Sequence, residues 1–449
     1  MRRMTFKEAA RAVGGEVTER GFRTGFVGVS TDTREYVRHT AFIAIKGENF
    51  DAHDYVKDAE ALGAACVIAE KDVDLGIAVI KVADTQQALL DLAGHYRAKF
   101  KIPIVAVIGS AGKTTTKDII FSVLSQKFNA LKTKGNLNNV IGLPQTLCGL
   151  EKEHEAAVFE MGINDFGEME RMAAAAKPDI AVFTNIGTAH VEKLGDREGV
   201  FAAKTEVINY LPKRKGIIIA NGADDMLLRL KRDKRTITYG EGETDDYRLT
   251  DYREEGLSSF FKVNGVDVTL NVIGKHNAYN AAAAFAVGKV LGLTDEEIAA
   301  GLAAFEPPYG RQNIFDVGDS FVINDTYNAN LSSVKAALNV LASFKQKGLK
   351  TIAVLGDMLE LGEQSESIHL EAGAYADRLK IDELFFIGDE AIHMAAGAKR
   401  GTHYKTKEEF LVSFGELPEK CAVLIKASRG MAFEEIAERI AGEEEETDT

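Results

Sequence analysis

The sequence predicts an α/β protein of three domains: a small α/β domain, a central doubly wound domain and a C-terminal Rossmann-like α/β domain. The length of 449 residues exceeds the roughly 150 residues of an ordinary domain. From about residue 100 onward, short β-branched runs alternate with segments of helical period. Two prolines interrupt this alternation within residues 306–310. We therefore expect domains at residues 1–98, 99–309 and 310–441, followed by a tail at 442–449.

The central domain is expected to begin its sheet with a buried strand at residues 104–108. A helix follows over residues 113–128, where apolar side chains recur at helical spacing. Three further apolar runs are typical of buried parallel strands. They lie at residues 156–159, 180–183 and 216–220.

The C-terminal domain repeats the same rhythm. Its expected strands lie at residues 321–323, 351–355, 383–387 and 421–425, with helical segments between them. Residues 1–98 form a separate, smaller α/β unit, which ends near the proline at position 103. The acidic tail at residues 443–449 is expected to have no fold of its own.

Composition excludes several classes of protein. The chain holds 54 Lys and Arg against 68 Asp and Glu, a net charge of −14, which argues against a nucleic-acid binder with a broad basic face. No apolar run approaches the roughly 18 residues that a membrane helix needs. The N-terminus lacks the apolar segment of a secretion signal, so a cytoplasmic location is expected.

Cys66, Cys148 and Cys421 are far apart, as expected for reduced core thiols.

The strongest local motif is a glycine-rich loop between the first central strand and its helix. Backbone N–H groups of such a loop close around phosphate oxygens at the helix N-terminus. Lys113 can reach the β- and γ-phosphates, and Thr114 or Thr115 can bind Mg²⁺. Val107 replaces the first glycine of the common P-loop, so this is a contracted form, and a chance glycine-rich turn is the alternative. The predicted ATP-binding residues are Gly109, Ser110, Ala111, Gly112, Lys113, Thr114 and Thr115.

Several polar residues follow the central strands, at the edge where doubly wound sheets bind ligands. Glu160 suits a Mg²⁺ ligand, although a solvated strand-end glutamate is equally probable on this pattern. His190 alone is more often a structural residue, and Lys204 alone is interpreted as a solvated helix lysine. Residues 274–280 open a helix, where they could contact a nucleotide or cap the helix.

Two loops of the last domain are rich in Asn and Asp. Residues 324–330 and 356–358 each follow an expected strand, and such loops serve turn formation and binding about equally. The chain has no G-x-S-x-G elbow, no H-E-x-x-H helix and no paired C-x-x-C. The common hydrolase, zinc-protease and zinc-ribbon classes are therefore disfavoured.

Taken in order and spacing, these motifs resemble those of the Mur ligase family over nearly the whole chain. The loops 327–330 and 356–362 are most similar to the member that adds D-alanyl-D-alanine, since sister ligases usually carry Tyr-Ala-His there. The matching segments are residues 30–34, 42–47, 51–54, 109–116, 135–139, 160–162, 190, 204, 274–277, 311, 325–330, 354–362 and 426–431.

The resemblance implies an ATP-dependent amide ligase of peptidoglycan precursor synthesis. It implies that the first domain binds UDP-N-acetylmuramoyl-tripeptide, the P-loop-type central domain ATP, and the last domain D-alanyl-D-alanine. ATP would phosphorylate the tripeptide carboxylate, and the dipeptide amine would attack the acyl phosphate. The family expectation is a monomer.

The resemblance also implies residue roles. Thr114, Glu160 and His190 would bind Mg²⁺, and a carbamylated Lys204 would bridge to a second Mg²⁺. Lys113, His190 and Lys204 would be the catalytic group. Nucleotide contacts would come from His276, Asn277, Arg311 and Asp325. Substrate contacts would come from Ser30, Thr31, Arg34, Lys46, Gly47, Asp51, His53, Asn136, Asn138, Asn139, Tyr327, Asn328 and Asn330.

The chain departs from the family pattern at four positions. Ala111 replaces the usual Asn, Thr326 a Ser, Leu331 a Pro and Ala427 a Gly. Another Mur ligase, or a ligase like folylpolyglutamate synthase, is the alternative within the enzyme class, and the 324–330 loop argues against it. A regulatory protein with a degenerate nucleotide site is disfavoured because Lys113, Glu160 and His190 are present.

Overall fold

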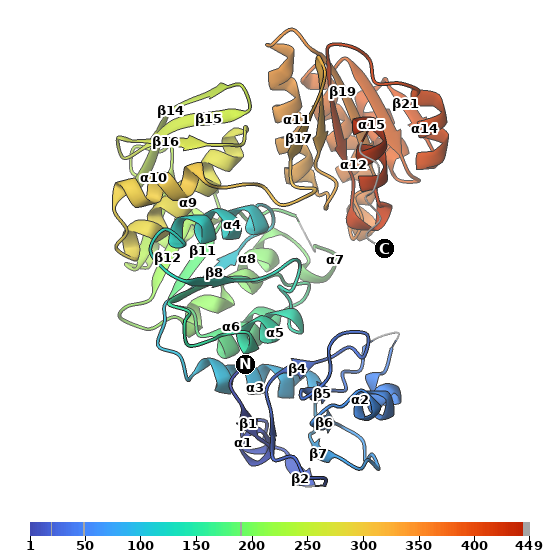
Figure 1. Ribbon diagram of the computed structural model, residues 1–449. Helices are drawn as coiled ribbons and strands as arrows, with labels where there is room; N and C mark the ends of the chain where they lie inside the picture. Colours follow the sequence, from blue (N-terminus) through green and yellow to red (C-terminus); the bar gives the residue numbers. More distant parts are fainter. Residues whose placement is uncertain (19, 48–49, 189–190, 443–449) are drawn as a thin grey trace. The chain divides into compact units, whose positions relative to one another are not determined.

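The computed structural model describes residues 1–18, 20–47, 50–188 and 191–442 (Figure 1). Their contacts define two compact units. The first comprises Met1–Ile108, Lys127–Val182 and Ala203–Ile218, and the second comprises Gly109–Gln126, Phe183–Ala202 and Ile219–Thr449. The predicted α/β class is confirmed by four sheets with helices between their strands.

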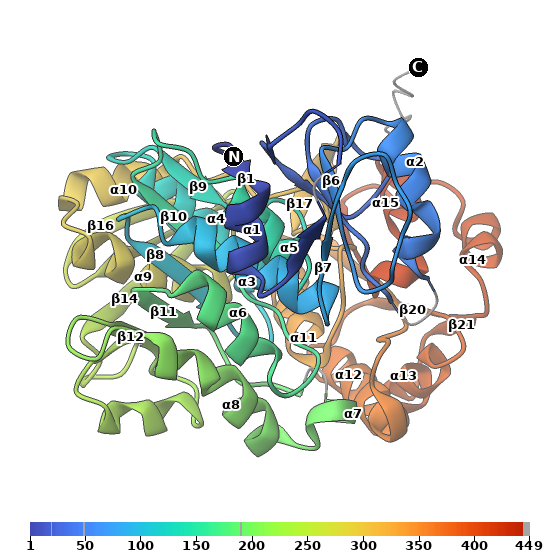
Figure 2. The same cartoon turned by 90° about the horizontal axis from the view of Figure 1, so that it is seen from below.

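The N-terminal region is built on a five-stranded sheet of order β2-β7-β6-β5-β4. All neighbours are parallel except β2, which pairs antiparallel with β7. Buried Phe42, Val56 and Val67 belong to its core, and α2 packs against β6 (Figure 2). The strands are β1 (Met4–Thr5), β2 (Glu16–Thr18), β3 (Gly25–Phe26), β4 (Val29–Ser30), β5 (Ala41–Ile43), β6 (Cys66–Ala69) and β7 (Ala78–Lys81). The helices are α1 (Phe6–Ala12), α2 (Val56–Ala61) and α3 (Thr85–Arg97).

A nine-stranded sheet follows, in the order β16-β15-β14-β13-β12-β11-β8-β10-β9. β10 pairs parallel with both β8 and β9, and the register places Glu160 opposite Val107. The strands are β8 (Ile104–Ile108), β9 (Ala130–Lys132), β10 (Ala156–Glu160), β11 (Ile180–Phe183), β12 (Ile217–Asn221), β13 (Thr236–Gly240), β14 (Tyr247–Glu255), β15 (Ser258–Val263) and β16 (Val266–Leu270). All four strands expected here are present within one residue at each end.

The helices of this region include one correction to the sequence prediction. α4 ends at Leu124 and not at residue 128. The amide of Gln126 donates a hydrogen bond to the carbonyl of Val123, three residues back, and the chain then continues into β9. α10 packs closely on α4, since a Cβ at Gly301 would lie 2.5 Å from the Cα of Val123. The helices are α4 (Lys113–Leu124), α5 (Gly142–Cys148), α6 (Glu168–Ala176), α7 (Val191–Leu194), α8 (Arg197–Thr205), α9 (Lys275–Val290) and α10 (Asp295–Ala303).

The C-terminal region has a six-stranded sheet of order β17-β18-β22-β19-β20-β21, parallel except for β17. The strands are β17 (Asn313–Val317), β18 (Ser320–Asn324), β19 (Lys350–Gly356), β20 (Glu383–Ile387), β21 (Thr402–Tyr404) and β22 (Cys421–Lys426). The helices are α11 (Leu331–Lys345), α12 (Ser365–Arg378), α13 (Ala391–Ala398), α14 (Lys407–Phe414) and α15 (Glu434–Ala441).

Two hydrophobic cores cover the two faces of this C-terminal sheet. Side chains of α11, α12 and α13 contribute to one, and side chains of α14 and α15 to the other. Every residue of β22 is buried, as expected for a parallel strand covered on both faces. Because β18, β22 and β19 are parallel, the loops after Asn324, Gly356 and Lys426 leave the same edge of the sheet.

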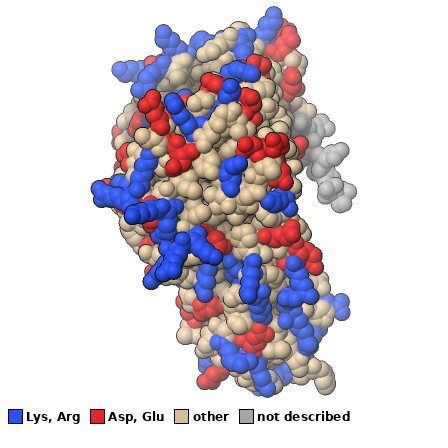
Figure 3. All heavy atoms as spheres, turned by 90° about the vertical axis from the view of Figure 1, so that its left-hand side faces the viewer, with Lys and Arg blue, Asp and Glu red and all other residues tan. Residues whose placement is uncertain are grey.

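Other sequence predictions concern the surface and the cysteines. On the face shown in Figure 3, Lys and Arg side chains are interspersed with Asp and Glu. Cys66, Cys148 and Cys421 are free and buried, which confirms them as core thiols. Burial raises the pKa of Cys148 to about 12. Within the described residues, no helix has the length and apolar character needed to cross a membrane.

Candidate active site

The phosphate loop is held in shape by the segment that follows β11. The carbonyl of Asn185 accepts the amide of Ser110 at 3.0 Å. The Asn185 side chain bonds both the N–H (2.9 Å) and the C=O (3.1 Å) of Ala111, and the Thr184 hydroxyl donates to the same C=O at 2.6 Å. A Cβ at Gly109 would collide with that hydroxyl. Hydrogen bonds within the protein therefore hold the loop, and Thr184 and Asn185, which make them, were not predicted from the sequence.

The contacts of Asn185 relate to Ala111, where this chain departs from the family pattern. The family usually has an asparagine at this position, and the alanine side chain lacks its amide. Asn185 places an amide side chain against the same peptide unit, where it fixes the backbone. Gly112, at φ 76°, has the left-handed conformation that glycine adopts without strain, and it starts α4. Lys113 and Thr114 thus occupy the first turn of α4, where backbone N–H groups favour an anion.

Arg311 contacts the phosphate loop in the second unit. Its Nη2 donates to the Thr114 hydroxyl at 3.0 Å, and its guanidinium carbon lies 3.9 Å from the centroid of the Tyr327 ring. The Nε of Arg311 is buried and has no partner among the described residues. An arginine fixed by stacking, with a donor to spare beside a phosphate loop, can bind a phosphate oxygen.

The start of α9 brings together His276, Asn277 and Gln312. The Asn277 amide donates to the carbonyl of Ile273 at 2.9 Å and to Gln312 at 3.1 Å, and Gln312 donates to the same carbonyl at 2.7 Å. Both donors of Asn277 are therefore used within the protein. Burial lowers the pKa of His276, which keeps its ring neutral near pH 7. Gln312 was not predicted from the sequence.

Glu160 is buried at the end of β10, so its interpretation as a solvated residue is wrong. Its Oε1 accepts the Asn138 amide at 2.7 Å, and its backbone N–H donates to the Thr133 hydroxyl. Its Oε2 is buried and has no hydrogen-bond partner in the described structure. A carboxylate oxygen that is withdrawn from water and left unbonded fits a hard cation such as Mg²⁺.

Two further residues, His190 and Lys204, were predicted to bind metal. His190 lies outside the described residues. Lys204, in α8, is only 1% exposed, so its interpretation as a solvated lysine is also wrong. The described residues contain no group of three or more His, Cys, Asp or Glu side chains close enough to hold a metal. Asn136 contributes its carbonyl to the turn before Asn138, and Asn139 accepts two backbone amides at the start of α5.

A cavity of about 290 Å³ opens in the N-terminal region. Two stacked aromatic rings, Phe50 and Tyr55, lie on its wall with centroids 5.1 Å apart. The pocket residues are Thr31, Asp32, Thr33, Arg34, Phe42, Phe50, Ala52 and Tyr55. The family resemblance pointed to Thr31 and Arg34 but not to the aromatic side chains, which could stack on a planar base.

The remaining predicted residues of this region support the pocket. Asp51 accepts the His53 ring (2.6 Å) and Lys71 (2.7 Å), and the Lys71 hydrogen bond lowers the pKa of the Asp51 carboxyl. The second ring nitrogen of His53 accepts the amide of Glu70. Lys46 pairs with Asp51 through the backbone. Ser30 and Gly47 make loop contacts: the Ser30 hydroxyl donates to the carbonyl of Asp32, and the Gly47 amide to that of Phe50.

In the C-terminal region, Asp325 pairs with the buried Lys426 at 2.7 Å, and burial lowers the pKa of that lysine. Asn330 caps α11 by accepting the amide of Ser333, and the Asn328 side chain accepts the amide of Ala329. These two asparagines shape the loop in the described structure. The Tyr327 ring lies against Arg311, as described above.

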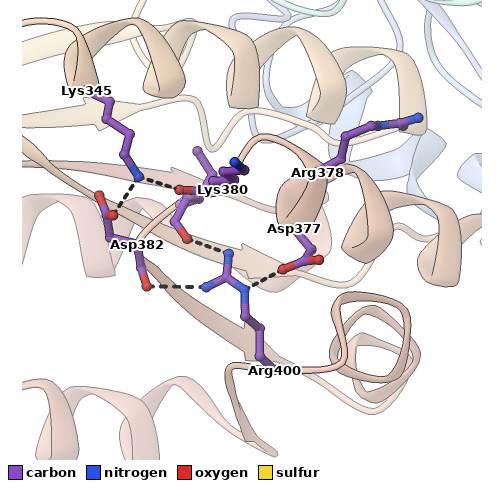
Figure 4. A pocket seen from close by; sticks show the side chains of 7 residues that line it. Lys345, Asp377, Arg378, Lys380, Asp382 and Arg400 are labelled. Carbon is purple, nitrogen blue, oxygen red and sulfur yellow. Dashed lines mark hydrogen bonds and ion pairs between the residues drawn. The ribbon is translucent and has the colours of Figure 1, made fainter.

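A second hollow lies where α12 turns into β20, at the opposite edge of the C-terminal sheet (Figure 4). Lys345 and Arg400 are bonded to Asp382 and Asp377 and to backbone carbonyls of the turn. Burial acts to raise the pKa of Asp382, but hydrogen bonds from Lys345 and Thr351 outweigh it and lower that pKa to about 2. This cluster is a structural clamp that contains none of the predicted site residues.

Comparison with known proteins identifies relatives along the whole chain. Three family models match: Mur ligase family, catalytic domain, at residues 26–97; Mur ligase middle domain at 107–288; and Mur ligase, glutamate ligase domain, at 310–429. The chain is 40% identical to the UDP-N-acetylmuramoyl-tripeptide–D-alanyl-D-alanine ligase of Bacillus subtilis (strain 168), with 97% of this chain and 98% of the relative covered. The ligase of the same name from Escherichia coli (strain K12) is 34% identical, with 91% and 92% covered.

Solved structures agree. MurF from Acinetobacter baumannii superposes with a TM-score of 0.92 at 32% identity, over 98% of this chain and 99% of that one. The MurF ligase of Thermotoga maritima, in complex with ADP, gives a TM-score of 0.83 at 28% identity, over 93% and 97%. The chain therefore belongs to the Mur ligase family.

Proposed function

We infer that this chain is an ATP-dependent amide ligase that joins D-alanyl-D-alanine to UDP-N-acetylmuramoyl-tripeptide. The products are UDP-N-acetylmuramoyl-pentapeptide, ADP and phosphate, so the enzyme serves peptidoglycan precursor synthesis. One observation carries this conclusion: relatives with this activity in their names align over 97% and 91% of the chain. The three matching family models span the N-terminal pocket, the phosphate loop and the C-terminal loops at 324–330 and 356–362.

The phosphate loop and Arg311 would serve phosphoryl transfer mainly by position and charge. Backbone N–H groups at the start of α4 and the Lys113 ammonium hold the triphosphate. Arg311, stacked on Tyr327, adds a guanidinium beside Thr114. Together they offset the negative charge on the phosphoryl group as it moves to the tripeptide carboxylate. The uncharged amine of D-alanyl-D-alanine then attacks the acyl phosphate, the amide bond forms and phosphate leaves.

We propose that Mg²⁺ is held by Thr114, Glu160 and His190, and that a carbamylated Lys204 serves a second Mg²⁺. The unbonded buried Oε2 of Glu160 and the burial of Lys204 support this assignment. Such ions would supply Lewis-acid polarisation and neutralise phosphate charge. Asn138, bonded to the other oxygen of Glu160, orients the carboxylate.

We also propose one substrate for each domain. Residues 1–98 would bind the UDP-sugar at the pocket beside Phe50 and Tyr55, residues 99–309 ATP, and residues 310–441 the dipeptide. Thr31 and Arg34 line that pocket. His276, Asn277 and Asp325 would lie near the nucleotide, and Tyr327, Asn328 and Asn330 in the dipeptide loop. We expect a monomer that works in the cytoplasm, where ATP is made and used.

Phosphate release tests the function directly. The purified chain should release phosphate from ATP only when both UDP-N-acetylmuramoyl-tripeptide and D-alanyl-D-alanine are present. The new product should match the pentapeptide by mass. Equal turnover without the dipeptide would refute the assignment. Replacing D-alanyl-D-alanine by a single amino acid separates this activity from that of a sister ligase.

A further inference from the structure

The segment 426–431 matches the family pattern, but the proposed function assigns it no role. It follows β22 at the edge of the sheet where the loops after β18 and β19 also emerge. The Ser428 hydroxyl accepts the amide of Leu359, and its own amide donates to the carbonyl of Asp357. The segment is therefore fixed to the 356–362 loop, and it presents two cations, Lys426 and Arg429.

Lys426 has no capacity left for a ligand. Its side chain is 2% exposed. Its ammonium donates to Asp325 Oδ2 at 2.7 Å, to the Asp325 carbonyl at 3.3 Å and to the Asn328 carbonyl at 2.8 Å. A lysine ammonium has three N–H donors, and here all three are used. Lys426 therefore holds the 325–328 loop in place.

Arg429 is the opposite case. Its side chain is 65% exposed, and Nη1 forms an ion pair with Glu434 Oε1 at 3.0 Å. Its guanidinium carbon lies 5.7 Å from the centroid of the Tyr327 ring, on which Arg311 also stacks. Glu434 and Tyr327 together restrict where the guanidinium can point. Most of its N–H donors remain available at this sheet edge.

The dipeptide presents two charged ends, but only one can serve for recognition. Its amine must lose a proton and attack the acyl phosphate, so a strong ionic contact there would oppose the reaction. The carboxylate takes no part in the chemistry. A planar guanidinium binds a carboxylate through two parallel hydrogen bonds.

Building on the proposed function, we propose that Arg429 binds the C-terminal carboxylate of the incoming D-alanyl-D-alanine. Tyr327 and Glu434 are its positioning residues. The site would select a free acid over an uncharged C-terminus and would fix the amine at a set distance from the anchor. Tyr327 acts here through the two arginines that lie against its ring.

The test compares D-alanyl-D-alanine with its C-terminal amide in the wild-type enzyme and in Arg429→Gln. Loss of a charged hydrogen bond should lower the wild-type kcat/KM for the amide by roughly 10- to 100-fold relative to the acid. Arg429→Gln should lose a similar factor with the acid and treat acid and amide alike. KM values for ATP and for the UDP-tripeptide should stay as in the wild type. Because the acid-to-amide ratio is measured within one protein, partial misfolding does not imitate this result.

Arg378→Gln is the matched control. Arg378 also lies over a tyrosine ring, 4.8 Å from the Tyr375 centroid, but it belongs to the clamp region at the opposite sheet edge (Figure 4). This variant should keep the wild-type acid-to-amide ratio. A wild-type ratio in Arg429→Gln, or an increase only in its KM for ATP, would overturn the role of Arg429. A wild-type enzyme that consumes neither dipeptide would instead overturn the proposed function.

Discussion

Lys204 is the residue whose surroundings differ most from its sequence pattern. A lysine in a charged helical segment is ordinarily solvated, yet this side chain is 1% exposed. A buried ammonium loses its hydration, so such a site favours pairing or a change of charge. Carbamylation would convert the cation into an anion suited to a metal ion.

We predict that Lys204→Ala lowers kcat by roughly 100-fold, because a metal-binding group is worth several kcal/mol to the transition state. Added short carboxylates should restore part of the activity by occupying the vacated space. The measurement is phosphate release with all three substrates. Lys215→Ala, at an exposed lysine, serves as the control and should behave as wild type. Full activity of Lys204→Ala without added carboxylate would refute the carbamate role.

His369 supports the 356–362 loop through one tautomer. Its Nε2 accepts the amide of Met358 at 3.0 Å, so its Nδ1–H donates to the carbonyl of Ser365 at 2.8 Å. A second proton on the ring would face the Met358 N–H and remove this bond. Burial lowers the pKa of His369 below the usual 6.5. The unfolded chain therefore takes up this proton at a higher pH than the folded chain does.

It follows that the contribution of His369 to stability is complete above about pH 6.5 and is lost as the pH falls through its lowered pKa. We predict that the melting temperature of the wild type falls more between about pH 7.5 and 5.5 than that of His369→Gln. The glutamine keeps an acceptor but does not titrate, and other groups contribute equally to both proteins. Parallel pH profiles of the two melting temperatures would contradict the prediction.

At the scale of elements, the contact between α10 and α4 controls how the phosphate loop is supported. Gly301→Ala places a methyl group 2.5 Å from the Cα of Val123, so one helix must move. We predict a loss of about 1–3 kcal/mol in unfolding free energy from overpacking, although alanine is the better helix former. KM for ATP should rise as well, because α4 carries Lys113 and Thr114. Ala300→Gly, at the exposed neighbouring position, should lower stability without changing that KM. A stabilised Gly301→Ala protein would show that the helices can separate freely.

Long buried strands were predictable because their apolar runs are continuous and end at glycine or polar residues. The strands at 180–183 and 383–387 begin and end as expected. The antiparallel strands β14, β15 and β16 were not predicted, since their alternating, half-exposed residues lack an apolar run. Asn264 and Gly265, both at positive φ in the turn from β15 to β16, were the available signal.

From the residues alone, the site was predictable only where a motif is local in sequence, and the family resemblance supplied Arg311 and Lys204. Gly112 and Lys113 belong to one short motif that can be found in the sequence. Asn185 and Gln312, in contrast, act through contacts with residues far away in the chain. Phe50 looks like any exposed aromatic residue until Tyr55 is placed beside it. Tertiary packing determines such pairings, and a single sequence does not reveal them.

At the scale of the whole molecule, separate hydrophobic cores predict that different ligands stabilise different regions against thermal unfolding. The N-terminal region has its own core around Phe42 and Val67, and the C-terminal sheet has two more. A chain of 449 residues with several cores need not unfold in a single step. A ligand stabilises what it binds by about 2.7 kcal/mol at 100 times its dissociation constant.

We therefore predict that scanning calorimetry of the full chain separates two ligand effects. The UDP-tripeptide should raise the transition of the region holding the 290 Å³ pocket, and ATP should raise the transition of the region holding the phosphate loop. Phe50→Ala should abolish the first shift and keep the second, because Phe50 lies on the pocket wall. Lys113→Ala should do the reverse. If each variant instead lost both shifts equally, the two substrates would share one cooperative unit, and the assignment of one substrate to each domain would be wrong.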